Sequence, residues 1–387
     1  MQAVFKCVEI IVFINSHFKE RMFKMPQKEI KIGIIGSGGI AALHAKSYKK
    51  MPDVKIVAVS DIIPGKSKKF LDNLNLEGAQ AFDDHRKLLE LELDGVSICT
   101  PNRAHYETSV DSLKEGKHVL VEKPMSVSLE QAIDMVKTAK QNRRILSVGF
   151  QPRYDPNMKV VKDIVQSGVL GNVYYIQTGG GRRRGIPGGT FINKDLAGAG
   201  SIADIGCYSL DLALNTLGNP KPLTVSAYTS NYIGTNPMYY DQAENFEVED
   251  FGVALIRLEG GKVLNFKISW AMHMDSLGPT LFLGTEAGLK LTPAGSGPWS
   301  GVWDGGIGSM TLFHDINGQH AETSIPVISQ NIDIFYEKVR DFVEAIKENK
   351  PAPIPGEEIL YNQAIIDGII KSSKLGKEVE IELANIS

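Results

Sequence analysis

The chain has 387 residues, 43% hydrophobic and 22% charged, so it is long enough for two globular domains with separate cores. Its formal net charge of −3 gives no field that attracts nucleic acid, and neither nucleic acid nor a membrane is expected as a partner. Three dispersed cysteines and eight histidines without ligand spacing argue against a disulfide framework and a metal site, and are typical of a cytoplasmic protein.

The first 28 residues are predicted to be an extension ahead of the first domain. Their apolar run, Val8–Ile14, is interrupted by Glu9 and has no small-residue cleavage site after it. It therefore matches neither a signal peptide nor a membrane span, which needs roughly 20 apolar residues. Met25 stands just before the first strand and is the natural start. The alternative is a weak contact of this stretch with a membrane surface or a partner.

Between residues 29 and 152, apolar strand segments alternate with helical segments. Strands are expected at 30–35, 54–60, 79–82, 95–99, 118–121 and 145–150, and helices at 39–50, 64–74, 83–91, 104–115 and 129–141. This alternation predicts an α/β domain with a parallel, doubly wound sheet.

Residues 153–387 are predicted to form a second α/β domain, for substrate binding and oligomerisation. Leu264, Phe266, Ile268 and Trp270 alternate with polar residues, which predicts an open, mostly antiparallel sheet with one covered face. Its other face is expected to be open for subunit contact. Further strands are expected at 225–230, 248–258, 281–284 and 309–314, helices at 160–166, 331–348 and 357–373, and a Gly/Pro-rich loop at 292–308.

A glycine-rich loop follows the first strand and opens the first helix: Gly36, Ser37, Gly38, Gly39, Ile40, Ala41. Gly36 permits the tight turn, Gly38 lets a pyrophosphate approach the backbone, and Ala41 allows close packing of helix on sheet. The helix N-terminus adds N–H donors. The loop therefore predicts a Rossmann dinucleotide-binding domain.

Asp61 ends the second strand, at the distance from the glycine loop where an acidic residue hydrogen-bonds the adenosine ribose. A carboxylate there also repels a 2′-phosphate, and no arginine stands immediately after it to bind one. NAD is therefore predicted, with NADP possible. The alternative for Asp61 is an ordinary carboxylate at a strand end.

The tripeptide Glu122-Lys123-Pro124 closes another predicted strand, which places Lys123 at the carboxyl edge of the sheet. Ligands bind at that edge in open α/β sheets. Together with the glycine loop, it predicts an ammonium group beside the reactive end of a nicotinamide cofactor.

Three features together resemble the Gfo/Idh/MocA oxidoreductases: the glycine loop, Thr100-Pro101-Asn102 with His105, and Glu122-Lys123-Pro124. The likeness extends to 149–154 and 198–206. The resemblance implies a Rossmann domain, a C-terminal α/β domain, sugar or polyol substrates, and a homodimer or homotetramer formed through the C-terminal sheet. It places Thr100, Pro101, Asn102, His105, Glu122, Lys123 and Gln151 at the cofactor.

The resemblance also implies a catalytic group of Lys123, Asp204 and Tyr208. Tyr208 replaces the commoner histidine of the family, as in branches similar to glucose–fructose oxidoreductase. A phenol near an ammonium group can lose its proton more readily, so Tyr208 is one candidate for the acid/base and Lys123 is the other. If the segment is helical, Asp204 and Tyr208 share one face, with Asp211 one turn further. The alternative is a tyrosine that only fills an amphipathic helix.

Arginines are the remaining candidates for substrate binding, because their forked donors suit hydroxyls and carboxylates. Arg153, Arg183 and Arg184 are expected to contact substrate, beside Lys123, Asp204 and Tyr208; a solvated sheet edge is the alternative for the arginine run. His44 is expected to pack in its helix or to meet a polar contact.

The sequence thus predicts an NAD(P)-dependent dehydrogenase acting on a secondary hydroxyl of a sugar, glycoside or cyclitol. Two alternatives remain open. One is an enzyme of the same family that cleaves glycosides with tightly held NAD. The other is a sugar- or dinucleotide-sensing protein without catalysis, against which Lys123 and Asp204 argue.

Overall fold

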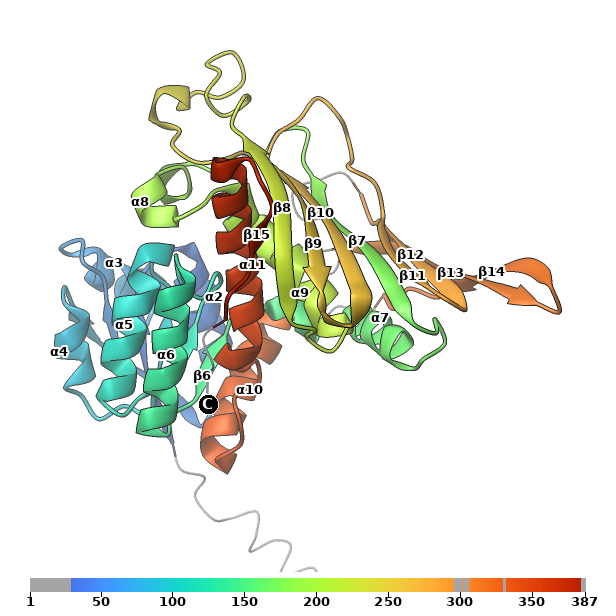
Figure 1. Cartoon of the computed structure of the whole chain (residues 1–387). Helices are drawn as coiled ribbons and strands as arrows, with labels where there is room; N and C mark the ends of the chain where they lie inside the picture. Colours follow the sequence, from blue (N-terminus) through green and yellow to red (C-terminus); the bar gives the residue numbers. More distant parts are fainter. Residues whose placement is uncertain (1–28, 296–301, 303–305, 330–331, 384–387) are drawn as a thin grey trace, which may run out of the picture.

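The computed structural model describes residues 29–295, 302, 306–329 and 332–383. The predicted extension at 1–28 and most of the predicted loop at 292–308 lie outside these residues. Two sheets of different architecture lie side by side, with helices between them (Figure 1). Within the described residues, no helix combines the length and apolar character needed to span a bilayer.

The N-terminal sheet has six strands among the described residues, in the order β3-β2-β1-β4-β5-β6, and every neighbouring pair is parallel. This order confirms the predicted Rossmann fold, and its direction reverses between β1 and β4, where such sheets bind ligands. The strands are β1 (Ile30–Ile35), β2 (Val54–Ser60), β3 (Gln80–Phe82), β4 (Gly95–Ile98), β5 (His118–Val121) and β6 (Leu146–Val148). The helices are α2 (Gly39–Tyr48), α3 (Lys66–Leu74), α4 (His85–Leu89), α5 (Asn102–Lys114) and α6 (Leu129–Asn142).

The C-terminal sheet has nine strands among the described residues, in the order β14-β13-β12-β11-β7-β10-β9-β8-β15. Neighbours are antiparallel except β7 and β10, which confirms the mostly antiparallel prediction. The strands are β7 (Val173–Gly181), β8 (Pro222–Ser230), β9 (Phe251–Leu258), β10 (Lys262–Ser269), β11 (Thr280–Gly284), β12 (Ala287–Pro293), β13 (Ile307–Ile316), β14 (Gln319–Ile325) and β15 (Val379–Glu380). Four of these, β7, β12, β14 and β15, were not predicted.

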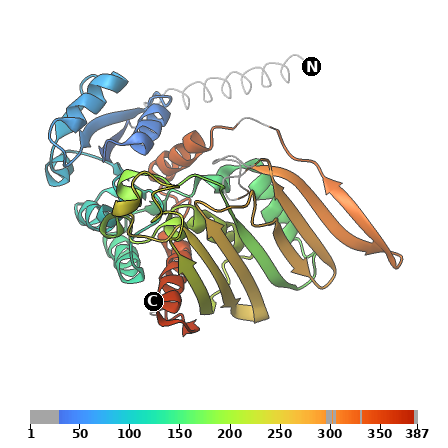
Figure 2. The ribbon, with the colours of Figure 1, turned by 90° about the horizontal axis from the view of Figure 1, so that it is seen from above.

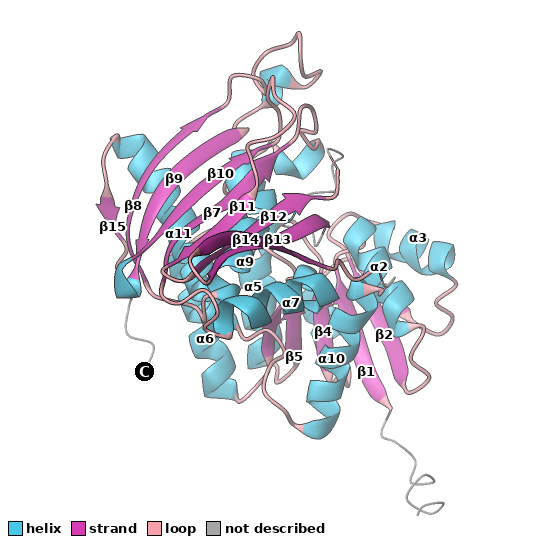
Figure 3. Ribbon diagram, turned by 90° about the vertical axis from the view of Figure 1, so that its right-hand side faces the viewer, coloured by secondary structure: helices cyan, strands magenta, loops and turns pink. Residues whose placement is uncertain are grey.

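Helices cover one face of this sheet, as the alternation in β10 predicts. Leu264, Phe266, Ile268 and Trp270 are fully buried. Behind the sheet lie α9 (Cys207–Thr216) and α11 (Gly356–Leu375), while α7 (Pro156–Gln166) packs against α9 (Figure 3). On the opposite face Leu255 and Tyr228 are exposed. The sheet therefore has one covered and one open face, with the covered face turned toward the first domain (Figure 1).

Helix α10 (Ile334–Glu348) returns from the C-terminal half to the N-terminal sheet (Figure 2). Its Val339 and Phe342 join a buried cluster with Ile32 of β1 and Tyr48 of α2. The predicted helices at 331–348 and 357–373 correspond to α10 and α11. The consequence for the site is that α10 brings side chains under the carboxyl end of β5.

Candidate active site

The glycine loop has the backbone that a bound diphosphate requires. Gly36 has φ +96°, and a Cβ on it would lie 2.5 Å from the carbonyl oxygen of Cys99, so a side chain is excluded there. A Cβ on Gly38 would meet no atom within 4 Å, so this part of the loop opens toward a ligand. No side chain caps the start of α2, which leaves its first N–H groups available to an anion.

Asp61 lies beside this loop, and its predicted contact with the adenosine ribose stays a prediction. Its Oδ2 accepts hydrogen bonds from the backbone N of Ser37 at 3.0 Å and from Ser37 Oγ at 2.6 Å. Burial alone would raise the pKa of Asp61, but bonds from Ser37 and Lys66 outweigh it and lower the pKa. Lys66 Nζ lies 2.9 Å from Asp61 Oδ2. Sequence reasoning missed Lys66 because it considered only the residues directly after Asp61.

Lys123 and Asp204 form an ion pair between the two halves of the chain. Lys123 follows β5, and Asp204 lies in a π-helical turn, Ile202–Gly206, that leads into α9. Lys123 Nζ donates to Asp204 Oδ1 at 3.0 Å and to its backbone oxygen at 2.7 Å. Burial alone would lower the pKa of Lys123, but the Asp204 carboxylate outweighs it and holds that pKa well above its usual range. The pair therefore presents a protonated ammonium group.

Tyr208 joins this pair, but not in the expected way. Lys123 Nζ lies over the face of its ring, 4.7 Å from the centroid, rather than at the hydroxyl. The hydroxyl instead accepts a hydrogen bond from Gln151 Nε2 at 2.7 Å. Burial raises the pKa of Tyr208 despite the lowering effect of Lys123. Lys123 thus acts in the expected direction, but desolvation outweighs its charge and the net pKa of the phenol is raised; a role of Tyr208 as acid/base stays a prediction.

Trp270, at the end of β10, is a partner of Asp204 that sequence reasoning missed. Its indole Nε1 donates to Asp204 Oδ2 at 3.0 Å, so the two carboxylate oxygens bind Trp270 and Lys123 separately. The sequence placed Trp270 on the covered face of its strand, and a buried tryptophan usually needs an acceptor for its N–H. The need for an acceptor could therefore have predicted a polar partner for Trp270.

Glu122 is buried beneath the site rather than exposed toward a cofactor. His44 Nε2 lies 2.8 Å from its Oε1, and Lys338 of α10 forms an ion pair with it. Burial alone would raise the pKa of Glu122, but Lys338 and His44 outweigh it and lower the pKa far below its usual range. The other ring nitrogen of His44 bonds Ser97, which confirms a polar contact for that histidine. Glu122 thus fixes the strand end that carries Lys123, and cofactor contact stays a prediction.

The Thr100-Pro101-Asn102 segment connects the two domains. Asn102 Nδ2 donates to the carbonyl of Ala197 at 3.0 Å. His105 is buried, with its Nδ1 2.7 Å from the carbonyl oxygen of Pro124. Among the described residues, Thr100 Oγ1 and Gln151 Oε1 are buried without a hydrogen-bond partner. Such orphaned polar atoms at the predicted cofactor site could bond a nicotinamide group.

The three arginines predicted to bind substrate differ in their contacts and exposure. Arg153 donates to Asp211 and Glu358, with distances of 2.7 Å and 2.8 Å, so protein carboxylates hold its guanidinium, and its contact with a substrate stays a prediction. Asp211, one helical turn beyond Tyr208, forms an ion pair with Arg153. Arg183 and Arg184 are exposed. Arg184 lies over the ring of Tyr239, 4.8 Å from its centroid.

These residues fit NAD. The loop from Gly36 to Ala41 would hold the diphosphate, Asp61 the ribose, and Thr100 and Gln151 the nicotinamide end, with Lys123 at the same sheet edge. Bound NAD supplies a hydride acceptor.

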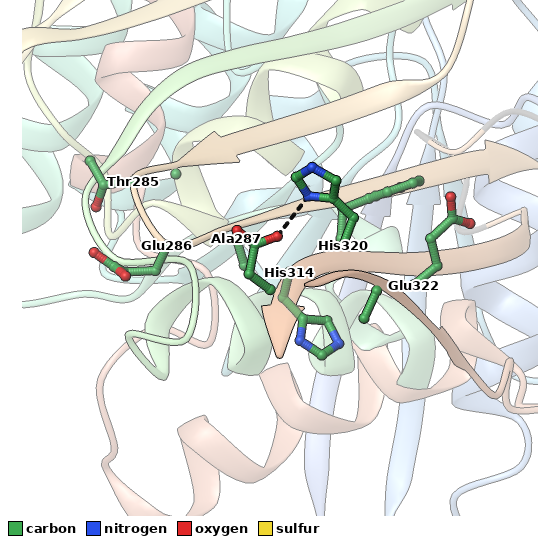
Figure 4. A pocket seen from close by; sticks show the side chains of 10 residues that line it. Thr285, Glu286, Ala287, His314, His320 and Glu322 are labelled. Carbon is green, nitrogen blue, oxygen red and sulfur yellow. Dashed lines mark hydrogen bonds and ion pairs between the residues drawn. The ribbon is translucent and has the colours of Figure 1, made fainter. Parts of the chain in front are cut away.

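An open hollow of about 390 Å³ lies elsewhere, at the outer end of the C-terminal sheet (Figure 4). The turn before β12 and the β13–β14 hairpin line it, and His320 Nδ1 lies 2.9 Å from Asp315 Oδ1 there. None of the predicted site residues borders it. No group of three His, Cys, Asp or Glu among the described residues has the arrangement of a metal site, in this hollow or elsewhere.

Comparison with known proteins agrees with this two-domain fold. Residues 30–150 match the model of an oxidoreductase family with an NAD-binding Rossmann fold, and residues 158–290 match the GFO/IDH/MocA C-terminal domain. Fold and site thus define an NAD-binding oxidoreductase with two domains. The chain belongs to the GFO/IDH/MocA family. Both matches fall inside the domains predicted at 29–152 and 153–387, whose boundaries stay a prediction.

Relatives include several sugar and cyclitol dehydrogenases. The chain is 34% identical over 279 residues to D-glucoside 3-dehydrogenase of Escherichia coli, covering 70% of this chain and 79% of the relative. It is 23% identical to the NADP-dependent scyllo-inositol 2-dehydrogenase IolW of Bacillus subtilis, over 91% of this chain and 96% of the relative. A levoglucosan dehydrogenase structure with NADH has a TM-score of 0.77 at 19% identity, covering 92% of this chain and all of the other, and supports the fold.

Proposed function

We propose that this protein oxidises a secondary hydroxyl of a hexose, glycoside or cyclitol with NAD, or carries out the reverse reduction. The carbon of the CH–OH group loses a hydride to NAD, and its oxygen loses a proton to the Lys123–Asp204 pair. The observation that carries the proposal is this ion pair, which joins the carboxyl end of β5 to the helix of the second domain. The relatives' substrates support the substrate class.

Lys123 is the better candidate for the group at the reacting oxygen. Its ammonium group is held protonated by Asp204, so it can donate a hydrogen bond to the hydroxyl oxygen and stabilise negative charge that develops there. Asp204 is the proton acceptor of the pair: when Lys123 takes the hydroxyl proton it passes one of its own to Asp204 Oδ1, 3.0 Å away, so the proton ends on the carboxylate. Tyr208 is buried with a raised pKa and is bonded to Gln151, which suits a role in orienting the site.

An exposed aromatic cluster supports a glycoside rather than a free sugar as the substrate. Tyr239 contacts His273 edge to face at 5.2 Å and Arg184 through its ring face. The flanking Met238 and Met274 are exposed. His273 and Met274 lie on the segment that follows Trp270, whereas Tyr239 comes from the segment between β8 and β9 and Arg184 from the segment after β7. An apolar group attached to a sugar would be bound by such side chains.

We also propose that the open face of the C-terminal sheet joins copies of the chain into a homodimer or homotetramer, in the cytoplasm. Exposed Leu255 and Tyr228 on that face support subunit contact. Size-exclusion chromatography with light scattering tests it: a monomer at micromolar concentration would refute the assembly.

The test of the function is a panel of free sugars, cyclitols and matched alkyl and aryl glycosides, each incubated with NAD while reduced cofactor is followed by absorbance. Product mass is measured in parallel. A product lighter by two hydrogens, formed together with NADH, is expected. Released aglycone without net NADH would instead identify a glycoside-cleaving enzyme. Binding of NAD without any turnover across the panel would refute the proposed reaction.

A further inference from the structure

Glu249, just before β9, is a buried carboxyl group that the proposed reaction does not use. Its Oε1 accepts hydrogen bonds from the backbone N of Gly200 at 2.7 Å and of Ile202 at 3.2 Å. Its own backbone oxygen accepts from Ser201 N at 3.0 Å. The carbonyl of Gly200 in turn accepts from Asp204 N at 2.9 Å. Glu249 thus holds the start of the turn that carries Asp204.

The next residue, Asp250, holds the other partner of Asp204. Its backbone oxygen accepts from Trp270 N at 2.8 Å, while Trp270 Nε1 binds Asp204. Its Oδ2 accepts from the backbone N of Gly234 at 2.5 Å. Gly234 lies so close to Phe246 that a Cβ would approach the ring to 2.4 Å, and Phe246 contacts Trp270 edge to face at 6.5 Å. Asp250 therefore supports Trp270 from two sides.

Glu249 and Asp250 thus both support the carboxylate of Asp204, the first through its turn and the second through Trp270. We propose that the Glu249–Asp250 dipeptide is a positioning element for catalysis, which fixes Asp204 through its turn and through Trp270 so that Asp204 meets Lys123. The inference rests on the proposed function. It assigns these two acids no contact with substrate or cofactor.

The chemistry of the two carboxyl groups suits this role. Both carboxyl groups accept hydrogen bonds from backbone N–H groups, which are fixed by the fold and need no long flexible side chain. A carboxyl oxygen that accepts two N–H bonds holds a backbone segment more firmly than one neutral bond does. Burial raises the pKa of Glu249 to about 7, with Asp250 as the neighbouring charge that adds to the rise. Keeping so costly a group buried is reasonable where it orders a site.

The experiment compares Glu249→Ala, Glu249→Asp and Glu249→Gln with a matched control, Glu247→Ala. Glu247 is exposed and also accepts a backbone N–H, from Lys194 at 3.0 Å, at the start of the short helix Lys194–Ala197. Four quantities are measured: kcat, KM, the Kd for NAD, and the NMR signal of the Trp270 indole N–H, assigned with Trp270→Phe. The indole signal reports the bond to Asp204 without any turnover.

We expect Glu249→Ala to lower kcat by about 10–100-fold, because misplacement of a catalytic group by about 1 Å costs on the order of 10²-fold. NAD binding should be unchanged, and the Trp270 signal should shift. Glu249→Gln retains an acceptor oxygen and should recover most of the activity. Glu249→Asp is the milder variant if the alanine variant does not fold, and should lower kcat because its oxygen falls short of Gly200.

A wild-type kcat in Glu249→Ala, or in Glu249→Asp, would overturn the proposal. So would a loss of kcat with an unmoved Trp270 signal, or an equal loss in Glu247→Ala. If no substrate turns over in the wild-type protein, the proposed function fails. The Trp270 signal then still decides whether Glu249 positions Asp204.

Discussion

Glu122 and Glu249 are both buried glutamates next to the Lys123–Asp204 pair, one in each half of the chain, yet they are held in opposite ways. Glu122 meets a lysine and a histidine, whereas Glu249 accepts hydrogen bonds from backbone N–H groups. The Lys338 ammonium group and the hydrogen bond from His44 lower the pKa of Glu122, whereas burial raises the pKa of Glu249 to about 7. Glu122 in the N-terminal half therefore stays ionised across physiological pH, while the C-terminal half contains Glu249, whose pKa lies near neutrality.

The first prediction concerns the N-terminal half of the site, where Lys338 forms an ion pair with Glu122. Lys338→Met should destabilise the protein by about 3–5 kcal/mol, because it leaves a buried carboxylate without its ammonium partner. The free energy of unfolding in urea measures this. Lys347→Met on the same helix removes a partly exposed ion pair with Asp53 and should cost under about 1 kcal/mol.

The double variant Glu122→Gln/Lys338→Met sharpens the same prediction. It removes both charges and should regain most of the lost stability. If Lys338→Met alone is as stable as Lys347→Met, the buried pair does not hold this half of the site.

The second prediction concerns the half held by N–H groups. Glu249 has a folded pKa of about 7 against 4.5 ordinarily, so the folded protein binds a proton that the unfolded chain releases between these values. Stability from this group is thus greatest below pH 4.5 and is lost as pH rises to 7, by about 3 kcal/mol. Glu249→Gln should remove this loss. The free energy of unfolding of the variant should therefore rise relative to that of the wild type between pH 5 and pH 8. A difference in unfolding free energy that does not change with pH would contradict the assignment.

The third prediction tests the charges at the glycine loop. NAD should exceed NADP by more than tenfold in kcat/KM, or about 1.4 kcal/mol, because Asp61 repels a 2′-phosphate. Lys66→Ala should widen the gap, since it removes the cation that lies 2.9 Å from Asp61, and Asp61→Ala should narrow it. Equal turnover with NADP in the wild-type protein would be incompatible with this role of Asp61.

The smallest effect is expected at Tyr208. Tyr208→Phe removes only the hydroxyl, which is bonded to Gln151, and leaves the ring under Lys123. We expect kcat to fall less than about tenfold, below the usual span of 10²–10⁴ for a general acid/base group. A loss within that span would make Tyr208 the proton carrier.

The features that could be predicted from the sequence are those that depend on local spacing or on a recognisable motif. The glycine loop, Asp61 and Lys123 were found because each stands at a fixed place relative to a strand. The meeting of Lys123 with Asp204 came from the family resemblance. In the fold, β10 was clear from its alternation, whereas β7 was missed because it ends in Gly179-Gly180-Gly181, and glycine is depleted in strands.

The missed residues depend on contacts between distant segments. Lys338 lies 216 residues from Glu122 in the sequence. The hydrophobic periodicity of a helix does not predict which carboxylate a buried lysine will contact. Its position between Phe335 and Phe342 on the apolar side of α10 was a usable signal. The partners of Arg153 were missed for the same reason, since Asp211 and Glu358 meet it only in the folded chain.

The most direct test of the central claim is a single-turnover comparison of wild-type protein with Lys123→Ala, using NAD and the best substrate of the panel. Binding of NAD is measured first by titration and should be equal in both. NADH formation should then be slower in the variant by about 10²–10⁴. Equal rates of NADH formation at equal NAD occupancy would contradict a catalytic Lys123–Asp204 pair.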